Sequence, residues 1–244
     1  MGAKEGKKRN GLHIKDWPIG ERPREMLLEK GPEALSDAAL LAILLRTGRQ
    51  GKDAVGLARE MLTEFSGFHG LMSATHEDLL AIKGVGKAKI AQILAAMEIV
   101  KRQLRQPLKK LNIIQNPHSL FDYLRASMGN LNREEFRLFH LNRSKHLIAE
   151  EVIFKGTLDF TAVYPREIVE SALREKASAL ILAHNHPTGL PKASSEDIEL
   201  TTALVKACWT IDIPILDHII IGKGECMSMK RHYPDIFEGA DEAA

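Results

Sequence analysis

The first half of the chain carries a helical pattern of hydrophobic residues. Apolar side chains recur there every three or four positions, a spacing that gathers them on one face of an α-helix. The segments with this pattern, separated by short glycine-containing turns, are residues 36–45, 52–65, 75–82 and 87–104. The strings DAALLAI and HEDLLAI in the first and third segments suggest two copies of a helix–turn–helix unit, although chance similarity between Leu/Ala-rich helices is a rival explanation. We therefore expect an all-helical module over residues 1–105.

The second half has a different hydrophobic pattern, in which apolar strands alternate with helices. Strands are expected at residues 135–142, 146–154, 178–183, 213–222 and 225–230, and helices at residues 165–177 and 194–209. Such alternation is typical of an α/β domain, which we place at residues 117–235. Residues 106–116 are then expected to form a basic linker, and residues 236–244 an acidic, frayed tail.

The length and composition are those of a soluble protein. The 244 residues, 44% of them hydrophobic, suffice for one or two ordinary cores. No apolar run approaches the roughly 20 residues of a membrane span, and the opening MGAKEGKKRNG lacks the apolar stretch of a signal peptide. Cys208 and Cys226 have no close partner spacing, which argues against a disulfide framework. We expect a cytoplasmic protein without a membrane partner.

Charge is distributed unevenly along the chain. Residues 1–116 contain 20 Lys and Arg against 13 Asp and Glu, a net charge of +7. Residues 117–244 contain 14 against 19, a net charge of −5. A basic half joined to an acidic half suggests two tasks, with any polyanion bound by the first half.

A glycine-rich turn in the basic half is the candidate for that contact. The string LLAIKGVGKAKI (79–90) resembles a helix-hairpin-helix element, in which the hydrophobic residue between the glycines anchors the turn. Glycines allow close approach of a phosphate, and the following helix start favours an anion. The predicted DNA-binding residues are therefore Gly84, Gly86, Lys87 and Lys89, with contacts that are salt-sensitive and indifferent to base sequence. The alternative is a hairpin used only for packing or protein contact.

Candidate metal ligands lie in the acidic half, in the string HNHPTGLPKASSED. His184 and His186 point the same way at the end of an apolar strand, because strand side chains alternate between faces. Asp197 falls in the first turn of the next helix, and the intervening loop is long enough to bring it back. Two imidazoles and one carboxylate form the three-ligand set of a catalytic zinc site, which leaves a fourth position open. Alternatively, Ser194 and Asp197 are only a capping box that starts the helix.

The spacing of these residues resembles a known signature. His184, His186, Pro187, Ser194 and Asp197 match the JAMM motif of MPN-domain metalloproteases without departure. The longer string ALILAHNHPTG…SSEDIELT…PILDHIIIG resembles the bacterial RadC family in particular, and the glycine-containing helices ahead of it also fit that family. The resemblance implies an α + α/β architecture, in which a helical helix-hairpin-helix module precedes an MPN-type domain with a mixed central sheet.

The resemblance also implies a reaction and further site residues. It implies one Zn²⁺ per chain and hydrolysis of a peptide or isopeptide bond in an unknown protein substrate, although the ligand set also suits iron or manganese. The family pattern includes a glutamate ahead of the site, for which Glu134 matches best and the adjacent Glu135 stays open. Ser194 is the expected donor to the oxyanion of the reaction. The rival functions are a DNA-repair-associated factor with a structural or vestigial metal site and a metal-dependent nuclease.

Overall fold

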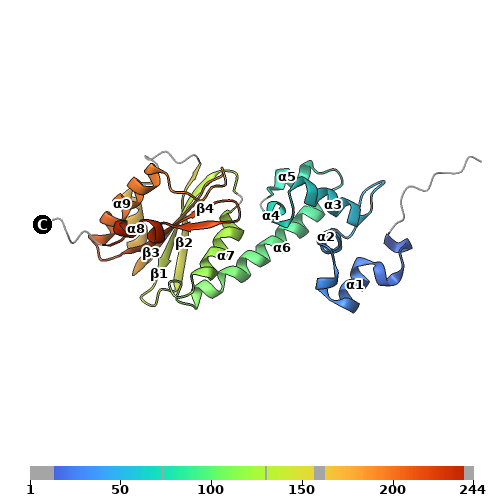
Figure 1. The fold of residues 1–244 in the computed structure, drawn as a ribbon, viewed down its shortest axis with the longest axis horizontal. Helices are drawn as coiled ribbons and strands as arrows, with labels where there is room; N and C mark the ends of the chain where they lie inside the picture. The colour runs from blue at the N-terminus through green and yellow to red at the C-terminus, as the bar shows by residue number, and fades with distance from the viewer. Residues whose placement is uncertain (1–13, 73, 130, 157–162, 239–244) are drawn as a thin grey trace, which may run out of the picture. The chain divides into compact units, whose positions relative to one another are not determined.

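The computed structural model describes residues 14–72, 74–129, 131–156 and 163–238. The chain divides into two compact units, and the boundary between them falls between Glu98 and Ile99, within helix α6 (Figure 1). The first unit is helical, and the second contains a five-stranded sheet with helices. The helical module followed by an α/β domain with a mixed sheet is therefore confirmed. No helix in the described part of the chain has the length and apolar character needed to cross a membrane.

The helical unit is built mainly from short helices, three of which begin at polar capping residues. Its elements are η1 (Ile14–Asp16), η2 (Ile19–Glu21), α1 (Pro23–Lys30), η3 (Pro32–Ala34), α2 (Asp37–Leu45), α3 (Ala54–Glu64), α4 (Phe68–Leu71), α5 (His76–Ala81) and the first part of α6 (Lys87–Arg105). Side-chain oxygens of Ser36, Asp53 and Thr75 accept hydrogen bonds from the first turns of α2, α3 and α5. The apolar faces pack into one core that includes Leu41, Leu57 and Leu79, so the amphipathic pattern of the sequence determines this unit.

The second unit is organised around a mixed sheet with the order β2-β1-β3-β4-β5. Its elements after α6 are η4 (Pro107–Lys109), α7 (Pro117–Met128), β1 (Glu134–Leu141), β2 (Leu147–Gly156), α8 (Pro165–Arg174), β3 (Ala179–Asn185), α9 (Ser195–Trp209), β4 (Ile215–Ile221), β5 (Cys226–Ser228), α10 (Met229–His232) and η6 (Pro234–Ile236). Strand β3 is parallel to β4 and antiparallel to β1, while β2 and β5 pair antiparallel at the two edges.

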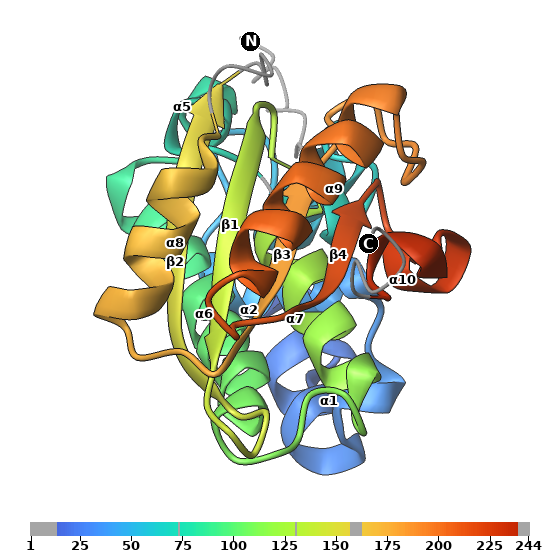
Figure 2. The ribbon, with the colours of Figure 1, turned by 90° about the vertical axis from the view of Figure 1, so that its left-hand side faces the viewer.

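Helices cover both faces of the sheet. Helices α8 and α9 lie over one face and α7 lies over the other (Figure 2). Strand β3 is buried along its whole length, and its side chains alternate between the two cores. Leu180 and Leu182 pack beneath α8 and α9, whereas Ile181 and Ala183 pack beneath α7. The continuous apolar run of β3 is thus the pattern of a central strand.

Two segments differ from the sequence expectation. The stretch 106–116, expected as a basic linker, contributes Leu108 and Ile113 to the core beneath α7. Lys109 and Lys110 are exposed while these two apolar side chains are buried, and the net charge of the stretch does not show that pattern. At the expected frayed tail, 236–244, Phe237 is buried in the core beneath α8 and α9. Residues 239–244 of that tail lie outside the described residues.

Candidate metal centre

Strand β3 and helix α9 bring the three predicted metal ligands together. His184 is the next-to-last residue of β3, and His186 follows immediately after the strand. Asp197 lies in the first turn of α9, where it and Ser194 form a complete capping box. The capping interpretation and the metal-ligand interpretation are therefore compatible, since one carboxylate oxygen is available for each.

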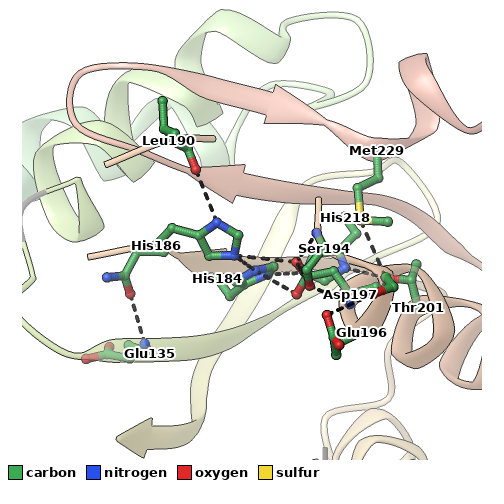
Figure 3. Close-up of polar contacts among 12 residues, drawn as sticks. Glu135, His184, His186, Leu190, Ser194, Glu196, Asp197, Thr201, His218 and Met229 are labelled. Carbon is green, nitrogen blue, oxygen red and sulfur yellow. Dashed lines mark hydrogen bonds and ion pairs between the residues drawn. The ribbon is translucent and has the colours of Figure 1, made fainter. Parts of the chain in front are cut away.

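The ligand atoms of these residues lie within 4.8 Å of one another (Figure 3). His184 Nε2 lies 3.0 Å from Asp197 Oδ1, and His186 Nε2 lies 3.4 Å from Asp197 Oδ2. The two Nε2 atoms are 2.8 Å apart. His184 is fully buried, Asp197 is nearly so, and the ring of Phe136 stacks on His184. His184 and Asp197 are therefore shielded from solvent, whereas His186 is partly exposed.

The outer hydrogen bond of His186 indicates what the centre of this group accepts. His186 Nδ1 lies 3.1 Å from the Leu190 carbonyl oxygen, which can only accept a hydrogen bond. In the neutral ring Nδ1 therefore carries the hydrogen, and the lone pair of Nε2 faces the Asp197 carboxylate. An imidazole lone pair and carboxylate oxygens at these distances repel one another unless a cation or a proton lies between them. The donor set fits a divalent metal ion bound by two imidazoles and one carboxylate.

The electrostatics of the group agree with a cation site. Burial alone raises the pKa of the Asp197 carboxyl, but the neighbouring His184, His186 and Ser194 side chains outweigh it and hold the pKa well below its usual range. The hydrogen bond to Asp197 raises the pKa of His186. Asp197 is thus a carboxylate anion near neutral pH, the form that a metal ion requires.

Strand geometry distinguishes Glu134 from Glu135. Phe136 pairs with His184 across the β1–β3 ladder, and it packs on the α9 face of the sheet. Glu134 precedes Phe136 by two positions and faces the same way, whereas Glu135 faces α7. Glu134 lines a pocket of about 350 Å³ with His186, Ser194 and Asp197 among the other lining residues.

The side chain of Glu135 forms an ion pair with Arg137. Its carboxylate lies 2.7 Å from Arg137 Nε, and both side chains are nearly buried. Its backbone N–H donates to Asn185 Oδ1, and Asn185 Nδ2 donates in turn to the Arg133 carbonyl. These bonds fasten the start of β1 to the end of β3. The residue between the two histidines of the motif therefore positions the strand that carries Glu134.

Ser194 lies at the same pocket, but its hydroxyl is directed at Asp197. Ser194 Oγ donates to Asp197 Oδ2 over 2.6 Å and accepts from the Asp197 N–H over 3.0 Å. In this arrangement Ser194 holds the carboxylate in place. Its expected donation to an oxyanion stays a prediction, because the hydroxyl must first turn away from Asp197.

Comparisons with known proteins cover both units. A family model described as a RadC-like JAB domain matches residues 114–233, and a model described as UPF0758 N-terminal matches residues 14–91. A UPF0758 protein of Cellvibrio japonicus is 44% identical over 89% of this chain and 97% of its own length. Another, from Ralstonia nicotianae, is 46% identical over 91% of this chain and 99% of its own length. The chain belongs to the UPF0758 (RadC) family.

The RadC-like domain also contains two site residues that sequence reasoning did not assign. His218 of β4 lies 2.7 Å from His184 through ring nitrogens, and Thr201 of α9 lies 2.6 Å from the other nitrogen of His218. The string LDHIII gave a signal, since a histidine in a strand beside β3 is able to reach a ligand imidazole. Its partner Thr201 gave none, because it lies within an ordinary helical pattern.

The predicted DNA-binding residues lie in the UPF0758 N-terminal region, at the turn between α5 and α6. Val85 is buried there, as the sequence predicts. Gly84 has φ +90° and lies under the side chain of Arg49, whereas a Cβ added at Gly86 would meet nothing within 4 Å. Lys87 is exposed, but Lys89 Nζ donates to the carbonyl oxygens of Gly48 and Gly84 over 2.9 and 2.7 Å. Gly84, Gly86 and Lys87 are exposed, whereas Lys89 is partly buried and bonded within the fold.

Proposed function

We propose that this protein is a zinc-dependent hydrolase of peptide or isopeptide bonds that acts in association with DNA. The observation that carries the hydrolase is the convergence of the His184, His186 and Asp197 ligand atoms beside a pocket that Glu134 also lines. A structural metal site needs no such pocket, since structural zinc is closed by four protein ligands. Three ligands and an adjacent carboxylate are the parts of a catalytic centre.

Each residue then has a separate role. His184, His186 and Asp197 would hold the zinc ion, which would supply Lewis-acid chemistry, because bound zinc acidifies water and polarises carbonyl groups. Glu134 accepts the proton of the attacking water and delivers it to the leaving amine, which restores the carboxylate. Ser194 fixes Asp197 by its hydrogen bond and lies within reach of the same pocket. Phe136 excludes water from the back of the His184 ring.

The charge of the pocket favours an amide over a phosphodiester. Besides Asp197, its lining includes the carboxylates of Glu134 and Glu196, and none of the described residues that line it is Lys or Arg. A polyanionic backbone is repelled by such a wall, whereas a neutral peptide group is not. The metal-dependent nuclease is therefore the weaker alternative.

Association with DNA is proposed for the helical unit. Gly86 is open to a close backbone approach, and the exposed side chains of Lys83 and Lys87 flank the turn. The turn opens directly into α6, whose first N–H groups favour an anion. The loop between α2 and α3 is less suited, because Glu60 already pairs with Arg49 and Lys52. We therefore propose that phosphate contact occurs at the turn between α5 and α6.

The hydrolase is tested by a matched pair of variants assayed on a peptide and isopeptide library. Glu134→Gln keeps the size of the side chain but removes its basicity, so hydrolysis should fall by about 10²–10⁴-fold while zinc content and stability stay nearly unchanged. Glu135→Gln should instead lower stability and leave the hydrolytic rate nearly unchanged. It weakens the nearly buried pair with Arg137 and should lower the free energy of unfolding by about 1–3 kcal/mol, with little change in the rate per folded molecule.

Three outcomes contradict this assignment. If the zinc-loaded wild-type protein cleaves no amide, the hydrolase fails and the DNA-associated factor with a structural metal becomes the better explanation. If a parallel nucleic-acid panel is cut instead, the nuclease replaces it. If Glu134→Gln hydrolyses at the wild-type rate, the base must be another residue.

A further inference from the structure

A chain of buried hydrogen bonds connects one metal ligand to the backbone of another. His218 is fully buried on β4, beside β3, and its ring lies between His184 and Thr201 (Figure 3). The distances are 2.7 Å from His184 Nδ1 to His218 Nε2 and 2.6 Å from His218 Nδ1 to Thr201 Oγ1. Thr201 Oγ1 lies 2.5 Å from the carbonyl oxygen of Asp197, one turn earlier in α9.

The carbonyl at the end of this chain sets the direction of the first bond, and a neutral His218 carries that direction on to His184. A carbonyl oxygen can only accept, so the Thr201 hydroxyl donates to Asp197; the Met229 sulfur, at 3.5 Å, is the poorer acceptor. The Thr201 oxygen therefore accepts from His218 Nδ1–H. A neutral His218 then has a bare Nε2, which accepts from His184 Nδ1–H. A neutral His184 is left with its lone pair on Nε2.

The surroundings of His218 keep it in the neutral form on which this order depends. Its ring is fully buried, and its hydrogen bonds run to a hydroxyl and to a second imidazole rather than to a carboxylate, so a charge on the ring would have no directly bonded counter-ion. The aromatic edge contact with Phe136, whose centroid lies 5.4 Å away, excludes water from one side. A charged His218 would present a second hydrogen to His184 and reverse the chain. Since the buried network has one consistent set of donors and acceptors, it selects one tautomer at each ring.

We propose that His218 and Thr201 are positioning residues that hold His184 in the tautomer whose Nε2 lone pair faces Asp197, and so prepare the site for zinc. The inference rests on the metal site of the proposed function, but it needs no hydrolysis. The same chain of hydrogen bonds also explains how β3 and α9 are held at the separation that the three ligands require. The chain runs from the side chain of His184 on β3, through β4, to the first turns of α9, which carry Asp197.

The experiment measures zinc affinity and the tautomer of His184 in the full-length protein. Thr201→Val keeps the shape of the side chain but removes the acceptor for His218 Nδ1–H, and Thr201→Ser keeps that acceptor. The first variant should weaken zinc binding by about 10–100-fold in competition with a chelator, and the second should restore most of the affinity. In the metal-free wild type, ¹⁵N shifts assigned with a His184→Gln variant should show the hydrogen on Nδ1 of His184.

The second unit offers a matched control for a purely structural effect. His140 and Ser171 form another buried histidine–hydroxyl pair, with 2.8 Å between His140 Nε2 and Ser171 Oγ, and the metal ligands are not among the partners of that pair. Ser171→Ala should lower thermal stability without changing zinc affinity. A positioning role is overturned if Thr201→Val and Ser171→Ala change zinc affinity alike, or if Thr201→Ser fails to restore it.

The remaining outcomes separate this inference from the proposed function. A hydrogen on Nε2 of His184 in the metal-free wild type also overturns it, whatever the protein hydrolyses. If the tautomer and the affinity series are as expected but no amide is cleaved, the positioning role stands and the hydrolase fails.

Discussion

The candidate metal centre and the glycine turn were both predicted from short motifs, but the side chains of the two motifs are arranged differently in the structure. In the second unit His184, His186 and Asp197 direct their ligand atoms at one point. In the helical unit Lys89 is used inside the fold, where it bonds to carbonyl oxygens of both glycine-containing loops. A ligand group must converge in order to work, whereas a basic residue near a turn serves stability equally well. A basic residue near a loop is therefore weaker evidence for a binding function than a group of side chains whose lone pairs converge on one point.

The largest expected effect separates metal binding from helix capping at Asp197. Asp197→Asn keeps an acceptor for Ser194 but removes the charge, so zinc affinity should fall by more than about 100-fold, beyond the loss from residues that merely support a ligand. His186→Ala should likewise lose zinc while the helical unit stays folded. Elemental analysis after dialysis measures both.

Ser194→Ala is the control for this pair. It removes the capping hydroxyl and should cost about 1 kcal/mol of stability, with zinc retained. Stoichiometric zinc in Asp197→Asn would show that the carboxylate is only a cap, and the contrast between the two units would then disappear.

The two glycines of the turn provide the next comparison. Gly84→Ala puts a side chain at φ +90°, where its Cβ would lie 2.6 Å from the Cβ of Arg49, and it should destabilise the helical unit by about 1–3 kcal/mol. Gly86→Ala meets no neighbour and should stay within about 1 kcal/mol of wild type. Urea unfolding followed by circular dichroism measures both. Equal losses would mean that a Cβ at Gly86 also meets a neighbouring side chain.

The two lysines divide stability from DNA contact. Lys89→Met leaves two carbonyl oxygens without their donor and should cost about 1–2 kcal/mol. Lys87→Met should leave stability unchanged but weaken binding to unrelated duplexes alike and reduce the salt slope by about 1. Fluorescence anisotropy at several salt concentrations measures the slope. If the wild-type protein binds no duplex at low salt, the glycine turn is a packing device and the proposed association with DNA is wrong.

The smallest expected effect is slow alkylation of Cys208, which, like Cys226, lies in the second unit. Burial raises the pKa of the Cys208 thiol from 9.0 to about 11. Its contribution to stability is therefore complete below pH 9.0 and is lost as the pH rises towards about 11. At about pH 8, iodoacetamide should label Cys208 only when the second unit opens, because the thiolate is the reactive form.

This labelling reports on one unit alone. Gly84→Ala and Lys89→Met should leave the labelling rate of Cys208 unchanged, although both destabilise the helical unit. Faster labelling in either variant would show that the two units unfold together.

The sequence predicted the elements whose pattern is strong and missed those whose role depends on neighbours. The helices α2, α3, α5 and α6 follow from their apolar spacing, and the strands β1 to β4 from their apolar runs. Helix α7 was not expected, although Pro117 stands at its first turn, because the adjoining residues were assigned to a linker by their charge. At the last expected strand Ser228 caps α10 and so ends β5 early.

The sequence alone determined which residues are able to bind a metal, since the spacing of His184, His186 and Asp197 relies only on strand alternation and helix capping. Only the tertiary structure shows that Glu134, and not Glu135, lines the pocket, because counting along the chain is uncertain by one residue whereas the pairing of β1 with β3 is not. It also decided the partners of Lys89 and His218. Each bonds to groups remote in the chain, and a hydrogen bond of that kind exists only where packing brings its two atoms within reach.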